Sequence, residues 1–292
     1  MFTGSKWKKF HILGQNNNVI KLKPIRFDGK LKGGSTKPWS VSCIDEGDPD
    51  LKLFPCVVKL FTPNNIAQSC HIAKEFICSE LAREFDLDTP ESYVIDLSDE
   101  DFVDTLTPKD LKELQSKHQG ATFCSRLVNA SLVNEELKKS TFSIWDCATL
   151  FAFDCMIMNA DRGGHHNKAN LLLDDDGFIV IDHELCLHFI DSDSEDAYEA
   201  ILEEFKNNNW PQIYQHHLFY SKLKSYRGQK RNLFDTFREY LDRMDVNKIE
   251  SLIAQLQGFG IDVGGSDRLI QYLYSLKQNS NKYCLIMLSL IA

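Results

Sequence analysis

One lysine and two aspartates stand at the ends of apolar segments, where charged side chains are uncommon. Lys59 follows the run PCVV, Asp161 lies in the polar segment NADRGGHHNKAN, and Asp182 ends the run FIVI. A lysine can hold phosphate oxygens, whereas carboxylates can ligate Mg²⁺ or orient an attacking hydroxyl group. An unpaired carboxylate at the end of an apolar strand is costly unless a cation or hydrogen-bond donors satisfy it. The order of these residues, with Asp182 placed 21 positions after Asp161, therefore predicts a site for phosphoryl transfer.

Two glutamates could pair with Lys59, and the sequence leaves both open. Apolar residues recur at spacings of three and four from Ile66 to Phe85, which predicts one helix. Glu80 flanks this apolar stripe, whereas Glu75 lies opposite to it. For a single glutamate on a helix, a solvated surface position is the more common situation.

The polar segment after Asp161 also offers amides that could bind a metal. Asn167 and Asn170 supply oxygen atoms of the kind that Mg²⁺ prefers. His165 and His166 are adjacent, so their side chains point in different directions, and they lack spaced Cys or His partners. We therefore do not expect a zinc site.

The elements that must position these residues fall into two parts, which predicts an α+β fold. Short β-prone runs over residues 1–62 predict a small antiparallel sheet, followed by the helix from Asn65, which should end before Asp88-Thr89-Pro90. ESYVIDL and ATFCSRLV predict two further strands, separated by an acidic surface helix and loop at about 98–119. We place the end of this N-terminal part near residue 129.

The second part, residues 130–292, is expected to be mainly helical. The segment FSIWDCATLFAFDCMIM is apolar on nearly every face, which is typical of a buried helix, and Ser140 or Thr141 could cap it. NLLL, DDDG and FIVID predict a hairpin that leads to Asp182. From Glu195 the pattern is helical to the end, with breaks at Pro211 and FGIDVGGS, and the apolar YCLIMLSLIA is expected to be a buried closing helix.

Composition and charge exclude several classes of function. The 292 residues are 43% hydrophobic and 26% charged, which is typical of a globular protein, and the net charge of -9 disfavours binding to nucleic acid. No segment approaches the length of a membrane span, and the start has no apolar run of signal-peptide length. The nine cysteines form no Cys-x-x-Cys pair, so they favour a reducing compartment and a cytoplasmic location.

Several segments together resemble the HipA-like kinases, a branch of the protein-kinase-like fold, in the compact form that lacks the N-terminal subdomain of larger members. The resemblance covers most of the chain. It rests on GGSTKPW, PCVVKLF, KEFICSELAREFDLDTPES, MNADRGGHHNKANLLL, FIVIDHELCL and HHLFYSKL. It implies a two-lobed fold, with a small β lobe that binds ATP over residues 1–129 and a helical lobe over residues 130–292.

The resemblance also assigns roles to individual residues. Lys59 resembles the strand lysine that contacts ATP phosphates, and Glu75 resembles the helix glutamate that steadies this lysine. Asp161 resembles the catalytic aspartate, with Arg162 as its usual neighbour, and Asp182 resembles the aspartate that binds Mg²⁺. His183 and Glu184 stand where other kinases carry Phe-Gly.

The metal-binding asparagine departs from the family pattern. The family places it five residues after the catalytic aspartate, which here is His166. Gly163-Gly164 suggests a one-residue insertion that would bring Asn167 into place, and we prefer this residue. Asn170 remains the alternative, because it stands just before the apolar strand.

The segment KGGSTKPW resembles the loop of the family that covers the phosphates. Gly34, Ser35 and Thr36 are then expected to contact ATP, because glycines allow backbone N–H groups to approach an anion. We also expect self-phosphorylation at Ser35 or Thr36, which would repel the ATP phosphates. An ordinary hairpin turn is the alternative interpretation of these residues.

The resemblance implies an enzyme that uses ATP and Mg²⁺ to phosphorylate Ser or Thr of a protein. A toxin of a toxin–antitoxin module, with an antitoxin-like partner, is one role that it allows. A small-molecule or lipid kinase is an alternative, since an Asp-Arg pair followed by Asn also occurs in lipid kinases. A third hypothesis, a pseudokinase that acts as a binding or immunity module, draws on the shifted asparagine spacing alone.

Overall fold

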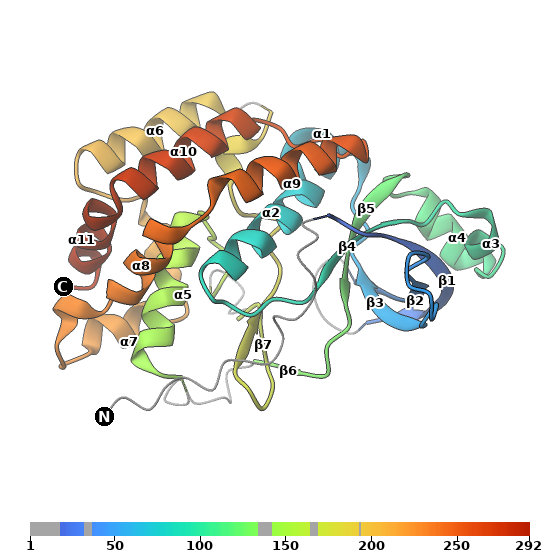
Figure 1. The fold of residues 1–292 in the computed structure, drawn as a ribbon, viewed down its shortest axis with the longest axis horizontal. Helices are drawn as coiled ribbons and strands as arrows, with labels where there is room; N and C mark the ends of the chain where they lie inside the picture. Colours follow the sequence, from blue (N-terminus) through green and yellow to red (C-terminus); the bar gives the residue numbers. More distant parts are fainter. Residues whose placement is uncertain (1–17, 32–36, 134–141, 164–168, 193) are drawn as a thin grey trace.

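The strands of this α+β protein gather at one end and most of its helices at the other (Figure 1). The computed structural model describes residues 18–31, 37–133, 142–163, 169–192 and 194–292. A small second sheet lies between the two ends, below α2 in the view of Figure 1. The candidate residues come from this middle region, where the strand end of β3, the helix α2 and the small sheet meet.

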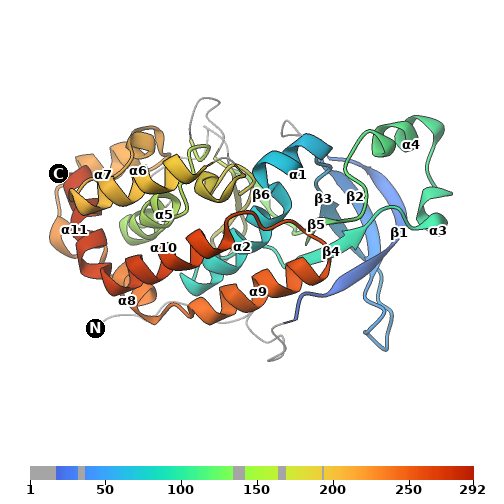
Figure 2. The ribbon, with the colours of Figure 1, turned by 90° about the horizontal axis from the view of Figure 1, so that it is seen from above.

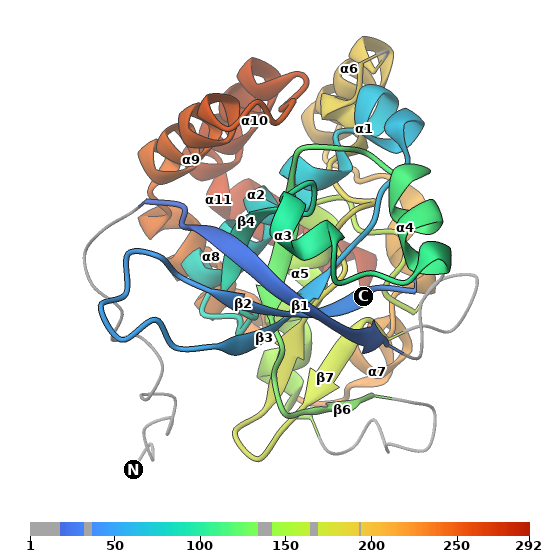
Figure 3. The same cartoon turned by 90° about the vertical axis from the view of Figure 1, so that its right-hand side faces the viewer.

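Five strands close into a barrel in the order β1-β2-β3-β5-β4. Their bounds are Lys21–Lys30 (β1), Trp39–Ile44 (β2), Phe54–Val58 (β3), Ser92–Asp96 (β4) and Ala121–Arg126 (β5). The expected antiparallel sheet is present, since β1–β2, β2–β3, β3–β5 and β4–β5 all pair antiparallel, and one further pairing departs from it. β1 pairs with β4 in parallel, through Lys21 with Val94 and Leu22 with Ile95, and this pairing closes the barrel. Figure 3 views the barrel with β1 crossing in front.

The interior of the barrel is apolar and rich in sulfur. Trp39, Val41, Val58 and three cysteine side chains, Cys43, Cys56 and Cys124, are fully buried there. Side chains of successive strand residues point to opposite faces, so these alternate positions form the inner face. All nine cysteines of the chain lie in the described residues, and none forms a disulfide.

Two short helices, α3 (Glu100–Val103) and α4 (Pro108–Gln115), form the insert between β4 and β5. The sequence predicted one surface helix and a loop here. Asp99 and Thr107 each cap one of the two helices by accepting a backbone N–H, which explains why the segment folds as two units.

The helix expected from Asn65 is two helices, α1 (Pro63–Ser69) and α2 (His71–Glu84). Thr62 caps α1, and Cys70 separates the two helices because its backbone has a left-handed φ of 46°. α2 packs against α9 (Figure 2) and is buried on almost every side. Even Lys74 and Glu75 are buried, which a helix with one apolar stripe would not predict.

The buried helix α5 (Ile144–Met156) forms the centre of the helical end. Ten of its thirteen residues are buried, which confirms the expected central helix. Its cap is Ser143, whose side chain accepts the backbone N–H of Asp146. The prediction of a cap at Ser140 or Thr141 was therefore wrong, since helix formation starts after both residues, which themselves lie outside the described residues.

The predicted hairpin is confirmed as β7 (Leu171–Leu173) and β8 (Phe178–Val180), with β6 (Ser131–Leu132) as a third strand. The backbone N–H of Asp174 donates to the carbonyl oxygen of Gly177 at 3.0 Å, which closes the turn. Val180 donates its backbone N–H to the carbonyl oxygen of Asp88 at 2.7 Å. The hairpin is thus attached to the segment that follows α2.

The remainder of the chain is helical, as expected. Its α-helices are α6 (Glu195–Lys206), α7 (Tyr220–Ser225), α8 (Asp235–Arg243), α9 (Val246–Gly258), α10 (Ser266–Gln278) and α11 (Ser280–Leu290). Short 3-10 helices span His188–Ile190 (η2), Gln212–His216 (η3) and Lys230–Asn232 (η4). In the part of the chain that the structure describes, none of the helices has the length and apolarity needed to span a bilayer.

Candidate active site

The ammonium group of Lys59 contacts three carboxylates. Lys59 directly follows β3, and its Nζ donates to Oε1 of Glu75, to Oδ1 of Asp182 at 2.5 Å and to Oε2 of Glu184 at 3.3 Å. These three carboxylates come from α2 and from the segment after β8. Lys59 is 13% exposed at its side chain, so the ammonium is held at the edge of the protein interior. We call Lys59, Glu75, Asp182 and Glu184 the lysine cluster.

Of the two glutamates proposed for Lys59, the structure brings Glu75 to it. Glu75 lies in the middle of α2 and is 2% exposed at its side chain. Glu80 instead pairs with Arg83, one turn further along the same helix, at 3.0 Å. The periodicity argument pointed to Glu80 because it assumed a solvated face, and α2 has almost none.

Burial and mutual repulsion shift the pKa values within the lysine cluster. Burial, with the nearby carboxylates of Asp182 and Glu184, raises the pKa of Glu75 to about 7 in spite of the Lys59 charge. Burial also raises the pKa of Glu184. For Lys59 burial acts in the opposite direction, but the three carboxylates outweigh it and hold the pKa well above the ordinary value. The ammonium is therefore charged at neutral pH, and the carboxylates compete for it.

The segment after β8 bends sharply so that both of its carboxylates reach Lys59. Asp182 has a left-handed φ of 69°, which turns the chain at this residue. The backbone N–H of His183 then donates to Oε1 of Glu75 at 3.2 Å. The His183 ring is 1% exposed, and burial lowers its pKa to about 3, so the imidazole is neutral. This bend places Asp182 and Glu184 on the same side of the chain.

Asp161 and Asn170 lie beside each other at the two ends of the polar segment. Nδ2 of Asn170 donates to Oδ2 of Asp161 at 2.8 Å, which leaves the amide oxygen of Asn170 as its atom for ligating a metal. The backbone N–H of Ile181 donates to the carbonyl oxygen of Asn170 at 3.2 Å, so Asn170 adjoins the residue before Asp182. Asn167, the preferred asparagine, lies outside the described residues. So do Gly34, Ser35 and Thr36.

Arg162 points away from Asp161 into the interior. Its Nε donates to Oδ2 of Asp154 at 2.5 Å, and its guanidinium also donates to the carbonyl oxygen of Asn170. Asp154 accepts a further hydrogen bond from Nδ2 of Asn159 at 2.9 Å, and Oδ1 of Asn159 accepts the backbone N–H of Asp161 at 3.0 Å. Arg162 and Asp154 thereby hold the backbone on both sides of the Asp161 side chain.

His217 completes this buried group. Its Nδ1 accepts the backbone N–H of Phe219 at 3.1 Å, so a neutral ring carries its proton on Nε2. Nε2 lies 2.9 Å from Oδ2 of Asp154, at the right distance to donate. Gly163 adds a steric link, because a Cβ there would lie 2.6 Å from the backbone nitrogen of Leu218. We call Asp154, Arg162 and His217 the aspartate cluster.

The oxygen atoms of the lysine cluster suit a hard divalent cation. One ligand oxygen each from Glu75, Asp182 and Glu184 lies within 4.8 Å of the others. Mg²⁺ binds carboxylate and amide oxygens and keeps several waters, so Asp182 together with Asn170 or Glu184 would be sufficient protein ligands. The donor set therefore fits Mg²⁺.

Comparison with known proteins decides the family. The family model described as "HipA-like kinase" matches residues 28–244, well over half of the chain. The chain belongs to the HipA-like kinases. No curated protein sequence matches this kinase. The crystal structure of a Helicobacter pylori proinflammatory kinase, CtkA, is similar to it with a TM-score of 0.50 and 12% sequence identity, and the alignment covers 91% of this chain and 97% of that one. At this identity the likeness shows the fold alone.

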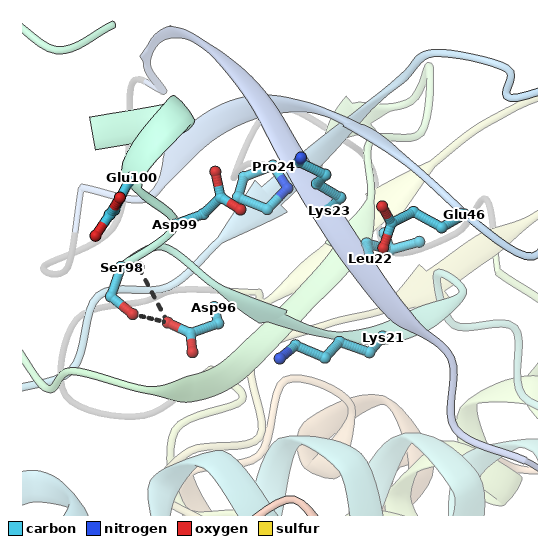
Figure 4. A pocket seen from close by; sticks show the side chains of 9 residues that line it. All are labelled: Lys21, Leu22, Lys23, Pro24, Glu46, Asp96, Ser98, Asp99 and Glu100. Carbon is cyan, nitrogen blue, oxygen red and sulfur yellow. Dashed lines mark hydrogen bonds between the residues drawn. The ribbon is translucent and has the colours of Figure 1, made fainter. Parts of the chain in front are cut away.

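A separate hollow lies on the barrel of this HipA-like kinase, away from the candidate residues. It measures about 490 Å³ and lies between the start of β1 and the segment from β4 to α3 (Figure 4). Its wall combines Lys21 and Lys23 with the carboxylates Glu46, Asp96, Asp99 and Glu100. Among the described residues, none of those predicted for catalysis or for ATP lines this hollow.

Sequence reasoning missed the aspartate cluster and the contact made by Glu184. Asp154 offered one signal, a charged residue inside an otherwise apolar helix, because such a residue is rarely fully buried without a partner. His217 lies in the segment HHLFYSKL, which carried part of the family resemblance without a role. In the sequence, Glu184 stood out only because His183 and Glu184 occupy the positions where other kinases carry Phe-Gly. Its contact with Lys59 required the bend at Asp182.

Proposed function

We propose that this HipA-like kinase transfers the γ-phosphoryl group of ATP, with Mg²⁺, to a serine or threonine hydroxyl of a protein. One observation carries the proposal: Lys59 is bound by both Glu75 and Asp182. The hydrogen-bonded pair of Asp161 and Asn170 lies next to the segment after β8 that carries Asp182. A held lysine, a metal-binding carboxylate and a second carboxylate near them are the groups that phosphoryl transfer requires. The kinase family supports the use of ATP.

Each residue then has a distinct task. Lys59 holds phosphate oxygens, and Glu75 fixes its direction from α2. Asp182 and an asparagine provide the oxygen atoms for Mg²⁺, which neutralises phosphate charge when it is bound. Asp161 orients the attacking hydroxyl group and accepts its proton. We further propose that the protein has a two-lobed protein-kinase-like fold, with the barrel in the small lobe and α5 to α11 in the helical lobe.

The choice of a protein substrate follows from the family resemblance, as does a role as the toxin of a toxin–antitoxin module with an antitoxin-like partner. The predicted cytoplasmic location agrees with both. Growth arrest on expression of the wild type, but not of Asp161→Ala, would support the toxin role. Equal growth of both strains, at matched protein levels, would refute it.

Labelling tests the central proposal. Purified kinase is incubated with γ-labelled ATP, Mg²⁺ and cell extract, and the labelled species are separated and identified. We expect a labelled protein that carries phosphoserine or phosphothreonine, and no label with Asp161→Ala. Asp175→Ala, which changes an exposed aspartate on the β7–β8 turn, serves as the matched control. Label in lipid or in a small metabolite would replace the protein substrate, and absence of both labelling and ATP binding would refute the kinase activity.

The identity of the metal-binding asparagine needs its own comparison. Asn167→Ala and Asn170→Ala are titrated with Mg²⁺ at fixed ATP. If only the Asn167 variant requires more Mg²⁺, the predicted insertion at Gly163-Gly164 is correct. If only the Asn170 variant does, the residue beside Asp161 is the ligand.

A further inference from the structure

The carboxylate of Glu184 contacts Lys59, but the proposed function gives Glu184 no role. We propose that Glu184 is a metal ligand, which together with Asp182 binds a divalent cation in competition with the ammonium group of Lys59. This inference rests on the proposed function, because the cation belongs to the phosphoryl-transfer site. It adds a ligand that the sequence did not assign.

The distances between the carboxylate oxygens are compatible with one shared cation-binding site. Nζ of Lys59 lies 2.5 Å from Oδ1 of Asp182 and 3.3 Å from Oε2 of Glu184, so one positive centre already bridges these two carboxylates. Ligand oxygens of one Mg²⁺ ion lie at most about 4.2 Å apart, given bond lengths of about 2.0–2.1 Å. The ligand oxygens of Asp182, Glu184 and Glu75 lie within 4.8 Å of one another. Small side-chain movements would therefore give metal geometry.

The charges favour an additional cation. Three carboxylates share the single ammonium group of Lys59, so negative charge exceeds positive charge within these contacts. Asp161 adds a further repulsion that acts on Glu184. A divalent cation between Asp182 and Glu184 would remove this repulsion. A glutamate on the surface would not need such a cation, because water solvates its charge.

If the ammonium group of Lys59 moves away, the buried carboxylate of Glu75 still has hydrogen-bond donors nearby. The backbone N–H of His183 donates to Oε1 of Glu75 at 3.2 Å. The His183 ring is almost fully buried, has no hydrogen-bond partner among the described residues, and places Nδ1 3.9 Å from Oε2 of Glu75. This polar side chain faces the cluster and can donate to Glu75 when the ammonium moves to phosphate oxygens. Asp182 and Glu184 are then available to the metal.

Mn²⁺ binding without nucleotide tests the proposal, measured from the electron paramagnetic resonance signal of free Mn²⁺. Glu184→Gln should weaken Mn²⁺ binding at least about tenfold, as expected for loss of a ligand. Lys59→Met should strengthen it by about the same factor, because it removes the competing ammonium, and Lys59→Met with Glu184→Gln should lose this gain. Glu80→Gln, on the same helix as Glu75, should bind Mn²⁺ as the wild type does.

A change of metal preference separates ligation from a structural role. In Glu184→Cys a thiolate replaces the carboxylate, so Cd²⁺ should be preferred over Mn²⁺ by at least about tenfold relative to the wild type. Unchanged Mn²⁺ affinity in folded Glu184→Gln, or unchanged metal preference in Glu184→Cys, would overturn the proposal. Neither result would affect the proposed kinase activity. Conversely, Glu184-dependent Mn²⁺ binding in a protein that transfers no phosphate would refute the proposed function alone.

Discussion

The aspartate cluster and the lysine cluster differ in charge balance. In the aspartate cluster one carboxylate meets one guanidinium, and the imidazole of His217 completes the group. In the lysine cluster three carboxylates meet one ammonium. Arg162 and Asp154 are fully buried, whereas Lys59, Asp182 and Glu184 are partly exposed.

This difference agrees with the proposal that the lysine cluster takes part in the reaction and the aspartate cluster supports it. Burial alone would raise the pKa of Asp154, but Arg162 and His217 outweigh burial and hold this pKa below its ordinary value. Both oxygens of the Asp154 carboxylate therefore have hydrogen-bond partners, and the aspartate cluster holds the backbone around Asp161 and Asn170. The lysine cluster carries an excess of negative charge and is partly exposed, which agrees with the site proposed for Mg²⁺ and phosphate.

Removing Asp154 should have the largest effect, because it leaves the Arg162 charge buried without an ionic partner. We expect Asp154→Ala to lower the free energy of unfolding by about 3–5 kcal/mol. Chemical denaturation monitored by circular dichroism measures this loss. The double variant Asp154→Ala, Arg162→Met should recover part of it, since removing both partners costs less than removing one. A loss below about 1 kcal/mol in the single variant would show that the aspartate cluster is not the support.

Removing Asp161 should affect chemistry and leave stability intact. We expect Asp161→Ala to lower the rate of phosphoryl transfer about a hundredfold or more, which is the scale of a positioned general base. Nucleotide affinity and the melting temperature should stay close to those of Asp175→Ala. A variant that transfers phosphate at the wild-type rate would contradict the role of Asp161.

Removing Asp182 should separate metal from nucleotide. Asp182→Ala should weaken the binding of ATP in Mg²⁺ at least about tenfold, because the metal no longer bridges the phosphates to the protein. Binding in the presence of a chelator should change little. Titration with a fluorescent ATP analogue measures both conditions. Unchanged affinity for ATP with Mg²⁺, in a folded variant, would remove Asp182 from the site.

The smallest effect concerns His71, at the start of α2 near Lys59. Burial, with the charges of Lys74 and Lys59, lowers the pKa of this imidazole to about 4 against the attraction of Asp182. The folded protein thus resists protonation that the unfolded chain accepts below about pH 6.5, so stability falls as the pH decreases through this range. Between pH 7 and 5.5 we expect His71 to contribute a loss of about 1 kcal/mol.

His71→Gln keeps a polar side chain that does not titrate, so its unfolding free energy should fall less over the same pH range. Denaturation curves of both proteins at each pH provide the comparison. Parallel pH profiles for the two proteins would show that His71 titrates alike in the folded and unfolded states.

Local patterns in the sequence were sufficient for the elements that carry the site. The run PCVVK predicts a strand that ends at Lys59, the apolar segment before Asp161 predicts a buried helix, and DDDG predicts the hairpin that leads to Asp182. Each of these elements is present. They were predictable because side-chain periodicity and turn residues act over a few neighbouring residues.

The sequence by itself therefore determined which charged residues follow which elements, together with the α+β class. Only the tertiary structure decided that Glu75 contacts Lys59, that Glu184 joins them, and that β1 closes the barrel against β4. The physical reason is the same in each case. These contacts join residues far apart in the chain, and they depend on a helix buried on nearly every face, a left-handed turn at Asp182 and a parallel pairing that no local periodicity specifies.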